Sequence, residues 1–181
     1  MRKIKGLKCL RCGREYGQEE VNYNCSACSE NLDIVYNYEE IRKTFTKESL
    51  SQNKEYSIWR YEPLLPIQDL SKIPPLQIGW TPLYEAKNLG KNLFLKDDGK
   101  NPSASFKDRA SAVAIVRAQE LGAKIVTGAS TGNAGSSMAC LAASLRIPAI
   151  IFVPQKAPKA KITQLLIFGA KVIMVKGTYD N

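Results

Sequence analysis

The sequence of 181 residues contains no histidine. This absence excludes Ser-His-Asp and Cys-His activation of a nucleophile, the H-E-x-x-H zinc site, and acid–base catalysis by imidazole. Any proton transfer must therefore be carried out by lysine, a carboxylate, tyrosine or a bound cofactor.

Long apolar runs are also missing. No stretch of about 18 apolar residues occurs, and residues 1–10 are basic without the apolar core of a secretory signal. We therefore expect neither membrane insertion nor export, and we predict a cytoplasmic protein. Because 44% of the residues are hydrophobic, the chain can bury a core, and its length allows one domain plus a small module.

The net charge of +9 is unevenly distributed. Residues 61–181 hold 15 Lys and Arg against 8 Asp and Glu, whereas residues 1–60 hold 11 against 9. A basic surplus suits a phosphorylated cofactor or substrate as well as nucleic acid. No basic stripe interleaved with aromatic residues occurs, so nucleic acid is the second choice of partner.

Four of the five cysteines form two CxxC pairs, Cys9 with Cys12 and Cys25 with Cys28, separated by 12 residues. This spacing is typical of a structural zinc site, in which four thiolates surround one Zn²⁺ and leave no open position for water. Two disulfides or a redox pair are the alternatives. The expected cytoplasmic location favours the metal. Cys140 lies on a helical pattern and is expected to be a small buried hydrophobe.

The chain divides into three parts by pattern. Residues 1–40 are predicted to form a zinc-ribbon-like module, and residues 41–91 an extended connecting segment, because this segment is rich in proline and carries few periodic signals. Residues 92–181 are predicted to form an α/β region.

Strands alternate with helices in the third part. Strands are expected at 93–96, 124–127, 149–153 and 171–175, and helices at 106–121, around 138–145 and at 159–168. Short connections between alternating elements predict right-handed crossovers and a parallel sheet with helices on both faces.

Two loops of the α/β region have unusual compositions. The loop 128–135 joins a strand to a helix and combines small residues with backbone N–H groups where a helix dipole favours an anion. It matches neither the P-loop nor the GxGxxG pattern, and a tight turn capped by Ser and Asn is the alternative. The loop 97–109 places Lys107 in the first turn of a helix, because Ser105 and Asp108 have the spacing of a capping box.

Lys107 is a candidate for Schiff-base chemistry. The helix dipole and burial beside Phe106 would both favour a neutral amine, which a Schiff base requires. A lysine at a helix start is most often solvated and without a chemical role, so this interpretation depends on reading the two loops together.

Both loops resemble one family. The segment Asn101–Arg109, N-P-S-A-S-F-K-D-R, resembles the N-P-T-x-S-F-K-D-R signature of the threonine synthases, and S-T-G-N at 130–133 resembles a second loop of that family. The cysteine module followed by N-L-D-I-V-Y-N-Y at 31–38 is similar to the N-terminal extension of many archaeal and bacterial members. The resemblance covers essentially the whole chain and implies a fold-type II enzyme that uses pyridoxal phosphate (PLP).

The resemblance also implies residue roles. Lys107 would hold PLP covalently and move protons at Cα and Cβ of the substrate, Asn133 would bind the 3′-oxygen of the cofactor, and Phe106 would pack against it. The substrate's anionic groups would be bound by three adjacent residues, Ser130, Thr131 and the backbone of Gly132. The implied reaction is that of a lyase of threonine biosynthesis, which converts O-phospho-L-homoserine and water to L-threonine and phosphate.

The sequence departs from the family in two ways. Ala134 stands where many members have Thr, and the family continues for a comparable length beyond this chain. We therefore expect an N-terminal fragment that is inactive alone, which pairs with a missing C-terminal half or is homo-oligomeric when full length. The alternatives are a threonine or serine dehydratase or a cysteate synthase of the same fold, and a non-catalytic zinc-ribbon protein that binds a partner or nucleic acid.

Overall fold

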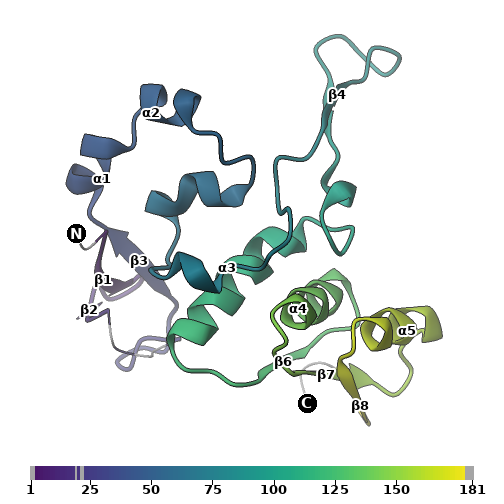
Figure 1. Cartoon of the computed structure of the whole chain (residues 1–181). Helices are drawn as coiled ribbons and strands as arrows, with labels where there is room; N and C mark the ends of the chain where they lie inside the picture. Colours follow the sequence, from purple (N-terminus) through teal and green to yellow (C-terminus); the bar gives the residue numbers. More distant parts are fainter. Residues whose placement is uncertain (1–2, 19, 21–22, 178–181) are drawn as a thin grey trace. The chain divides into compact units, whose positions relative to one another are not determined.

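The computed structural model describes residues 3–18, 20 and 23–177 (Figure 1). The chain forms two compact units. The first consists of residues 1–55 with 59–66, and the second of residues 56–58 with 67–181. Among the described residues, no helix has the length and apolar character that crossing a membrane requires.

The first unit is built around a small antiparallel sheet. Its three strands lie in the order β2 (Glu15–Tyr16), β1 (Ile4–Cys9), β3 (Leu32–Tyr36). Cys9 is the last residue of β1 and pairs with Leu32. The sheet therefore ends at the first cysteine, and the turns that carry the CxxC pairs extend from this end.

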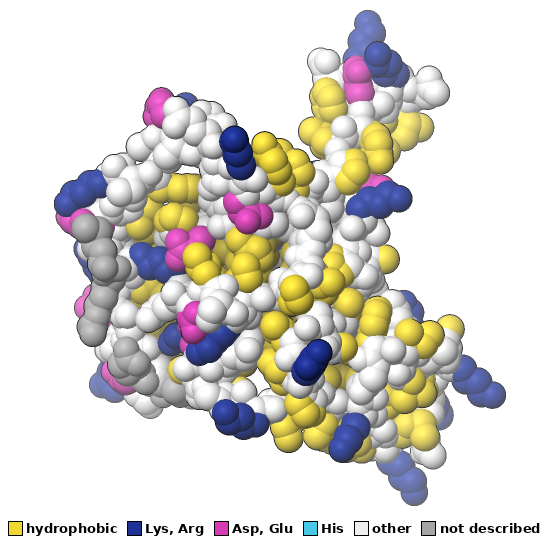
Figure 2. Space-filling model, viewed as in Figure 1, with side chains coloured by type: hydrophobic (Ala, Val, Ile, Leu, Met, Phe, Trp, Pro, Cys, Tyr) yellow, Lys and Arg dark blue, Asp and Glu magenta, His cyan; other side chains and the backbone are white. Residues whose placement is uncertain are grey.

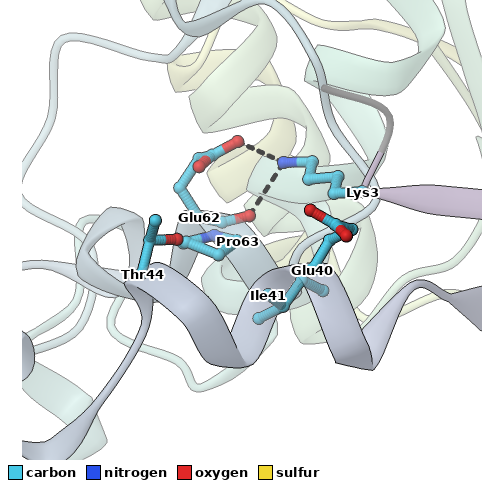
Figure 3. A pocket seen from close by; sticks show the side chains of 6 residues that line it. All are labelled: Lys3, Glu40, Ile41, Thr44, Glu62 and Pro63. Carbon is cyan, nitrogen blue, oxygen red and sulfur yellow. Dashed lines mark hydrogen bonds and ion pairs between the residues drawn. The ribbon is translucent and has the colours of Figure 1, made fainter.

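A cavity of about 210 Å³ lies in the first unit beside α1 (Tyr38–Thr44) and the 3-10 helix η1 (Ile58–Leu64) (Figure 3). The amine of Lys3 contacts the carboxylate of Glu62 and donates to the backbone carbonyl of Glu62 at 2.8 Å. These contacts tie the chain just before β1 to η1.

The segment 41–91 is not uniformly extended, which differs from the expectation. It contains part of α1, four further elements and the chain between them: α2 (Lys47–Gln52), η1, η2 (Leu70–Lys72) and β4 (Leu83–Glu85). The sequence carried a signal for α2, because Thr46 and Ser49 form a capping box with hydrogen bonds of 3.2 and 2.9 Å. The predicted domain boundaries stay predictions.

The second unit contains the predicted parallel sheet, so the α/β class is confirmed. The strand order is β6 (Val126–Ala129), β7 (Ala149–Pro154), β8 (Lys171–Val175). These strands are joined by α4 (Asn133–Ser144) and α5 (Lys159–Ile167), and α3 (Lys107–Glu120) packs against α4. The core contains the fully buried side chains of Leu141, Ile151, Val153 and Leu165.

Two details of the predicted sheet are wrong. β5 (Phe94–Lys96) pairs antiparallel with β4 and is not a strand of the parallel sheet. Within residues 23–177, α4 and α5 lie on one side of the sheet (Figure 1), because its strands lie side by side in chain order and both right-handed crossovers then fall on that side. The register partners Phe152 and Ile173 share the other face and are 36% and 42% exposed.

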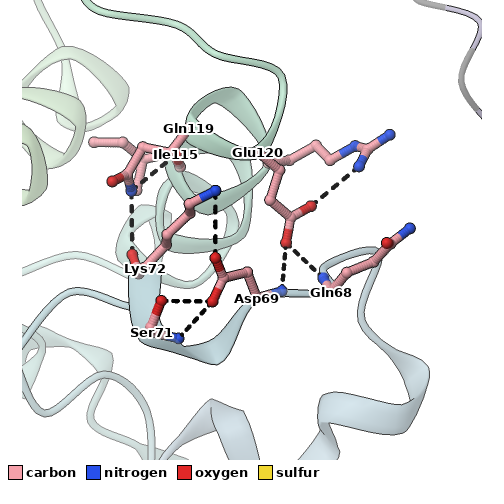
Figure 4. Close-up of polar contacts among 8 residues, drawn as sticks. Gln68, Asp69, Ser71, Lys72, Ile115, Gln119 and Glu120 are labelled. Atoms are coloured by element: carbon pink, nitrogen blue, oxygen red, sulfur yellow. Dashed lines mark hydrogen bonds and ion pairs between the residues drawn. The ribbon is translucent and has the colours of Figure 1, made fainter.

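The far end of α3 is anchored by Glu120 (Figure 4). Its carboxylate accepts hydrogen bonds from the backbone N–H groups of Gln68 (2.5 Å) and Asp69 (2.7 Å) and from the guanidinium of Arg117 (3.0 Å). Burial alone would raise the pKa of Glu120, but these hydrogen bonds lower it below its ordinary value. The carboxylate therefore holds the segment before η2 against α3.

We expect Glu120→Ala to lower the free energy of unfolding by about 2–3 kcal/mol at pH 7, because two backbone amides lose a charged acceptor. Since the pKa of Glu120 is lowered by folding, this contribution is fully present above the ordinary glutamate pKa of about 4.3 and is lost as the pH falls through the lower folded value. Urea unfolding of both proteins at several pH values measures the difference. An equal difference at pH 7 and below pH 4 would contradict this account.

Candidate active site and cysteine cluster

Lys107 is the first residue of α3, so the predicted position in the first turn is confirmed. The predicted capping box is wrong. Ser105 accepts a hydrogen bond from the backbone N–H of Lys107 at 3.1 Å, but Asp108 binds Ser103 instead of Ser105. Ala104, with a φ of 59°, turns the backbone between the two serines, so that Ser103 faces the carboxylate.

Phe106 lies beside Lys107 but does not bury it. The Lys107 amine is 5.0 Å from the centroid of the Phe106 ring, within the range of a cation–π contact. The Phe106 side chain itself is 57% exposed, and Lys107 is half-buried. Lys107 is therefore only partly buried beside Phe106.

A network of charged hydrogen bonds braces the start of α3. Arg109 donates two hydrogen bonds to the carboxylate of Asp98, at 3.0 and 2.8 Å, and the hydroxyl of Thr81 donates a third at 2.6 Å. The hydrogen bonds from Arg109, together with that from Thr81, lower the pKa of Asp98 to about 2. This network fixes the first turn of α3 to two segments that precede it in the chain.

The buried side chain of Asn101 holds the loop before Lys107 through hydrogen bonds to backbone groups. Its side chain is buried, accepts a hydrogen bond from the N–H of Gly79 at 2.8 Å and donates one to the carbonyl of Asp98 at 2.9 Å. The backbone N–H of Ala104 donates to the Asn101 carbonyl at 2.8 Å. The first residue of the matching motif thus has a structural role in this chain.

The second loop lies between β6 and α4. The N–H of Ser130 donates to the carbonyl of Phe152 at 3.2 Å, and the N–H of Gly132 donates to the Ser130 hydroxyl at 3.2 Å. α4 then begins at Asn133, preceded by Gly132 without a side-chain cap. Asn133 is exposed and Ser130, Thr131 and Gly132 are partly exposed, so the positive end of a 12-residue helix is open to a ligand.

Gly135, for which the sequence predicted no separate role, keeps this loop close to α4. A Cβ atom on Gly135 would lie 2.3 Å from the backbone carbonyl oxygen of Ser130. A Cβ atom on Gly132 would come no closer than 4.0 Å to the Ser130 hydroxyl. The final glycine of the loop therefore allows the close approach of its backbone to the helix.

We expect Gly135→Ala to displace the 130–132 loop and to lower the free energy of unfolding by about 1–3 kcal/mol, because the clash is with backbone and cannot be relieved by a rotamer change. Gly132→Ala is the matched control and should change stability much less. Chemical denaturation of both variants tests the comparison. Equal stability losses would show that the close approach at Gly135 is not the constraint.

The two helices that begin at the candidate residues pack together. α3, which starts at Lys107, lies along α4, which starts at Asn133. Burial, together with the negative charge of Asp108 in α3, raises the pKa of Cys140 in α4 to about 11. Cys140, predicted to be buried, is half-buried and remains a neutral thiol.

The four remaining cysteines come together as predicted. Their Sγ atoms all lie within 4.8 Å of one another, with distances of 3.5 Å from Cys9 to Cys28 and from Cys12 to Cys25. All four are free, and a disulfide requires about 2.05 Å. Four Zn–S bonds of about 2.3 Å in a tetrahedron would place the sulfur atoms about 3.8 Å apart. The arrangement therefore has the size of a tetrahedral metal site.

Surrounding donors favour thiolates at two of these cysteines. The hydroxyl of Tyr16 donates to Cys25 Sγ at 3.1 Å and lowers the pKa of Cys25 to about 6. The backbone N–H of Cys12 lowers the pKa of Cys9. At Cys28 a backbone hydrogen bond acts in the same direction, but burial and the neighbouring cysteines raise the pKa to about 12. Sequence reasoning missed Tyr16, which lies four residues after the first CxxC pair.

The sequence is similar to a known enzyme family and to individual proteins of that family. Residues 75–181 match the model of a family described as "Pyridoxal-phosphate dependent enzyme". The chain is 42% identical over 180 residues to a protein named threonine synthase from Methanocaldococcus jannaschii, a match that covers 96% of this chain. It is 38% identical over 181 residues to a threonine synthase of Methanosarcina acetivorans, a match that covers 97% of this chain.

The chain spans 44% of the length of each of these two relatives. Among solved structures, maize serine racemase is similar with a TM-score of 0.52 and 27% identity, over 56% of this chain and 32% of that one. The similarity to the two threonine synthases thus includes the cysteine cluster and both loops, whereas the structural match covers little more than half of the chain.

Proposed function

Because the chain belongs to the pyridoxal-phosphate dependent enzyme family, we propose that it is the N-terminal part of a threonine synthase. The observation that carries this proposal is the position of the half-buried Lys107 as the first residue of α3, directly after a loop held by hydrogen bonds. Similarity to two threonine synthases over nearly the whole chain supports this choice over the dehydratase and cysteate synthase alternatives.

PLP, when bound, supplies an electron sink for carbanions at the substrate. Lys107 would hold the cofactor covalently and move protons at Cα and Cβ of O-phospho-L-homoserine, in a reaction that converts this substrate and water to L-threonine and phosphate. Phe106, whose ring lies against the Lys107 side chain, would pack against the cofactor. Asn133, exposed at the first position of α4, would donate a hydrogen bond to the 3′-oxygen.

The second loop is suited to the substrate's anionic groups. The hydroxyls of Ser130 and Thr131 and the backbone of Gly132 lie where the dipole of α4 is positive, and no side chain caps this helix. Small uncharged residues allow a carboxylate or phosphate to approach the backbone closely. We therefore propose a phosphorylated amino acid as the substrate class.

We also propose that a further polypeptide, equivalent to the rest of the relatives' length, completes the site, and that the full-length enzyme is homo-oligomeric. The hairpin of β4 and β5 exposes large apolar side chains, and Figure 2 shows hydrophobic residues gathered over it: Leu83, Tyr84, Phe94 and Leu95. Two-stranded hairpins are at best marginally stable alone. The exposed sheet face at Phe152 and Ile173 likewise lacks a covering layer within residues 23–177.

For the cysteine cluster we propose one structural Zn²⁺ in a cytoplasmic protein, where thiols stay reduced. Four sulfur ligands leave no position for a substrate or water, so the metal would stabilise the first unit and take no part in the reaction. The hydrogen bonds from Tyr16 and the Cys12 amide support thiolate ligands at Cys25 and Cys9.

We predict one zinc per chain after purification without added metal. Cys25→Ser should lose most of the zinc, because it removes one of four ligands. Cys140→Ser is the matched control, since Cys140 lies outside the cluster, and it should retain the metal. Elemental analysis of the three proteins measures the content. Well-folded wild-type protein with far less than one zinc per chain would sink the proposal.

The functional proposal predicts that this chain, fused to the remaining part of the Methanocaldococcus jannaschii relative, releases phosphate from O-phosphohomoserine when PLP is supplied, and that the chain alone does not. Lys107→Ala should lower the rate by about 10²–10⁴-fold, because it removes both the covalent attachment and the proton carrier. Lys100→Ala, an exposed lysine of the same loop, should retain activity. A phosphate assay measures all four proteins.

Borohydride reduction of the PLP-loaded fusion, followed by peptide mapping, identifies the modified lysine. The label should lie on Lys107 and not on Lys100. An active fusion labelled at another lysine would overturn every role assigned here. Ammonia and 2-oxobutyrate formed from threonine, without phosphate release from O-phosphohomoserine, would establish the dehydratase alternative.

A further inference from the structure

Asp108, the neighbour of Lys107, is buried to an unusual degree for a carboxylate. Its side chain is 0% exposed. One carboxylate oxygen accepts from the backbone N–H of Ser103 at 2.7 Å, and the other accepts from the hydroxyl of Ser103 at 2.5 Å. The two hydrogen bonds close the loop from Ser103 to the first turn of α3.

The charge of Asp108 has no cationic partner among the described residues, whose ion pairs involve other carboxylates. A buried carboxylate held only by uncharged donors is costly, and its negative charge also raises the pKa of the Cys140 thiol. Asparagine would have nearly the same shape without this cost, but it offers a single acceptor oxygen. In asparagine an NH₂ group would replace one carboxylate oxygen, so the hydrogen bond that the Ser103 hydroxyl donates to Oδ1 would be lost or reversed.

The geometry connects this contact to the direction of the Lys107 side chain. Consecutive residues of an α-helix leave its axis about 100° apart. Fixing Asp108 inward therefore fixes the direction in which Lys107 leaves the first turn. The loop must also hold Ala104 at a φ of 59°, a conformation that a residue with a side chain adopts only when its surroundings enforce it.

We infer that Asp108 is a positioning residue for Lys107: its carboxylate clamps Ser103 to the helix start and sets the orientation of the lysine amine. The functional meaning of this inference rests on the proposed role of Lys107 in holding PLP. The hydrogen bonds between Asp108 and Ser103, and their effect on the lysine, can be measured without cofactor.

The test compares two lysines of the same chain. Lys159 is also the first residue of a helix, α5, and the following residue is Ala160, which cannot form such a clamp. Trace acetylation with acetic anhydride over a range of pH, read by mass spectrometry, gives the rate and the pH profile of each lysine. We expect the acetylation rates of Lys107 and Lys159 to differ in wild type. Asp108→Asn should change the rate of Lys107 by about threefold toward that of Lys159, an effect of the size of one hydrogen bond.

Two further variants make the outcome decisive. Ser103→Ala keeps the charge and volume of Asp108 and removes the hydroxyl hydrogen bond, so it should shift Lys107 in the same direction by a similar factor. It replaces Asp108→Asn as the test if that variant does not fold. Glu120→Ala removes a buried carboxylate at the other end of the same helix and should leave the Lys107 profile unchanged. Hydrogen exchange at the Ser103 amide confirms that the clamp has opened.

The inference is overturned if the acetylation profile of Lys107 already matches that of Lys159 in wild type. It is also overturned if the Lys107 profile stays the same when the Ser103 amide becomes exchangeable, or if Glu120→Ala changes that profile as much as Asp108→Asn does. Failure of the functional proposal gives a different result. In that case borohydride trapping of PLP would miss Lys107, while its acetylation profile would still respond to Asp108.

Discussion

The start of α3 depends on one constraint: the fully buried carboxylate of Asp108 and the partly buried carboxylate of Asp98 must both find hydrogen-bond donors. Asp98 obtains them from Arg109 and Thr81, and Asp108 obtains them from Ser103. Because the contacts of Arg109 and Asp108 join the first turn of α3 to segments before it, they also hold the loop that leads to Lys107. The charged and polar residues of the motif therefore shape the helix start from which the lysine projects.

The second loop, residues 128–135, is held in place by close backbone packing and not by charged hydrogen bonds. It has no charged residue and relies on the absence of side-chain atoms, since Gly135 lets the helix approach the Ser130 carbonyl. A loop held by charged hydrogen bonds thus presents a lysine, and a loop held by close backbone packing presents the positive end of a helix. The proposed function would use both groups, the amine to hold PLP and the helix end to bind an anion.

Stability in the two units has different sources. The parallel sheet and its helices bury a continuous apolar core in the second unit. The first unit has a small sheet with few buried side chains, and its cysteine cluster is where a bound metal would contribute to folding. The β4–β5 hairpin of the second unit leaves large apolar side chains exposed.

The sequence by itself determined the order of helices and strands from α3 to β8, the meeting of the four cysteines, and the placement of Lys107 in a first helical turn, because periodicity, ligand spacing and helix-start signals are local. Only the tertiary structure decided which partner each polar side chain takes. Asp108 binds Ser103 because Ala104 adopts a positive φ, Tyr16 reaches Cys25 across the small sheet's end, and β5 pairs with β4 in a hairpin. These partners lie on different segments of the chain, and which segments meet depends on the backbone conformation between the elements. The periodicity and spacing of residue types do not specify that conformation.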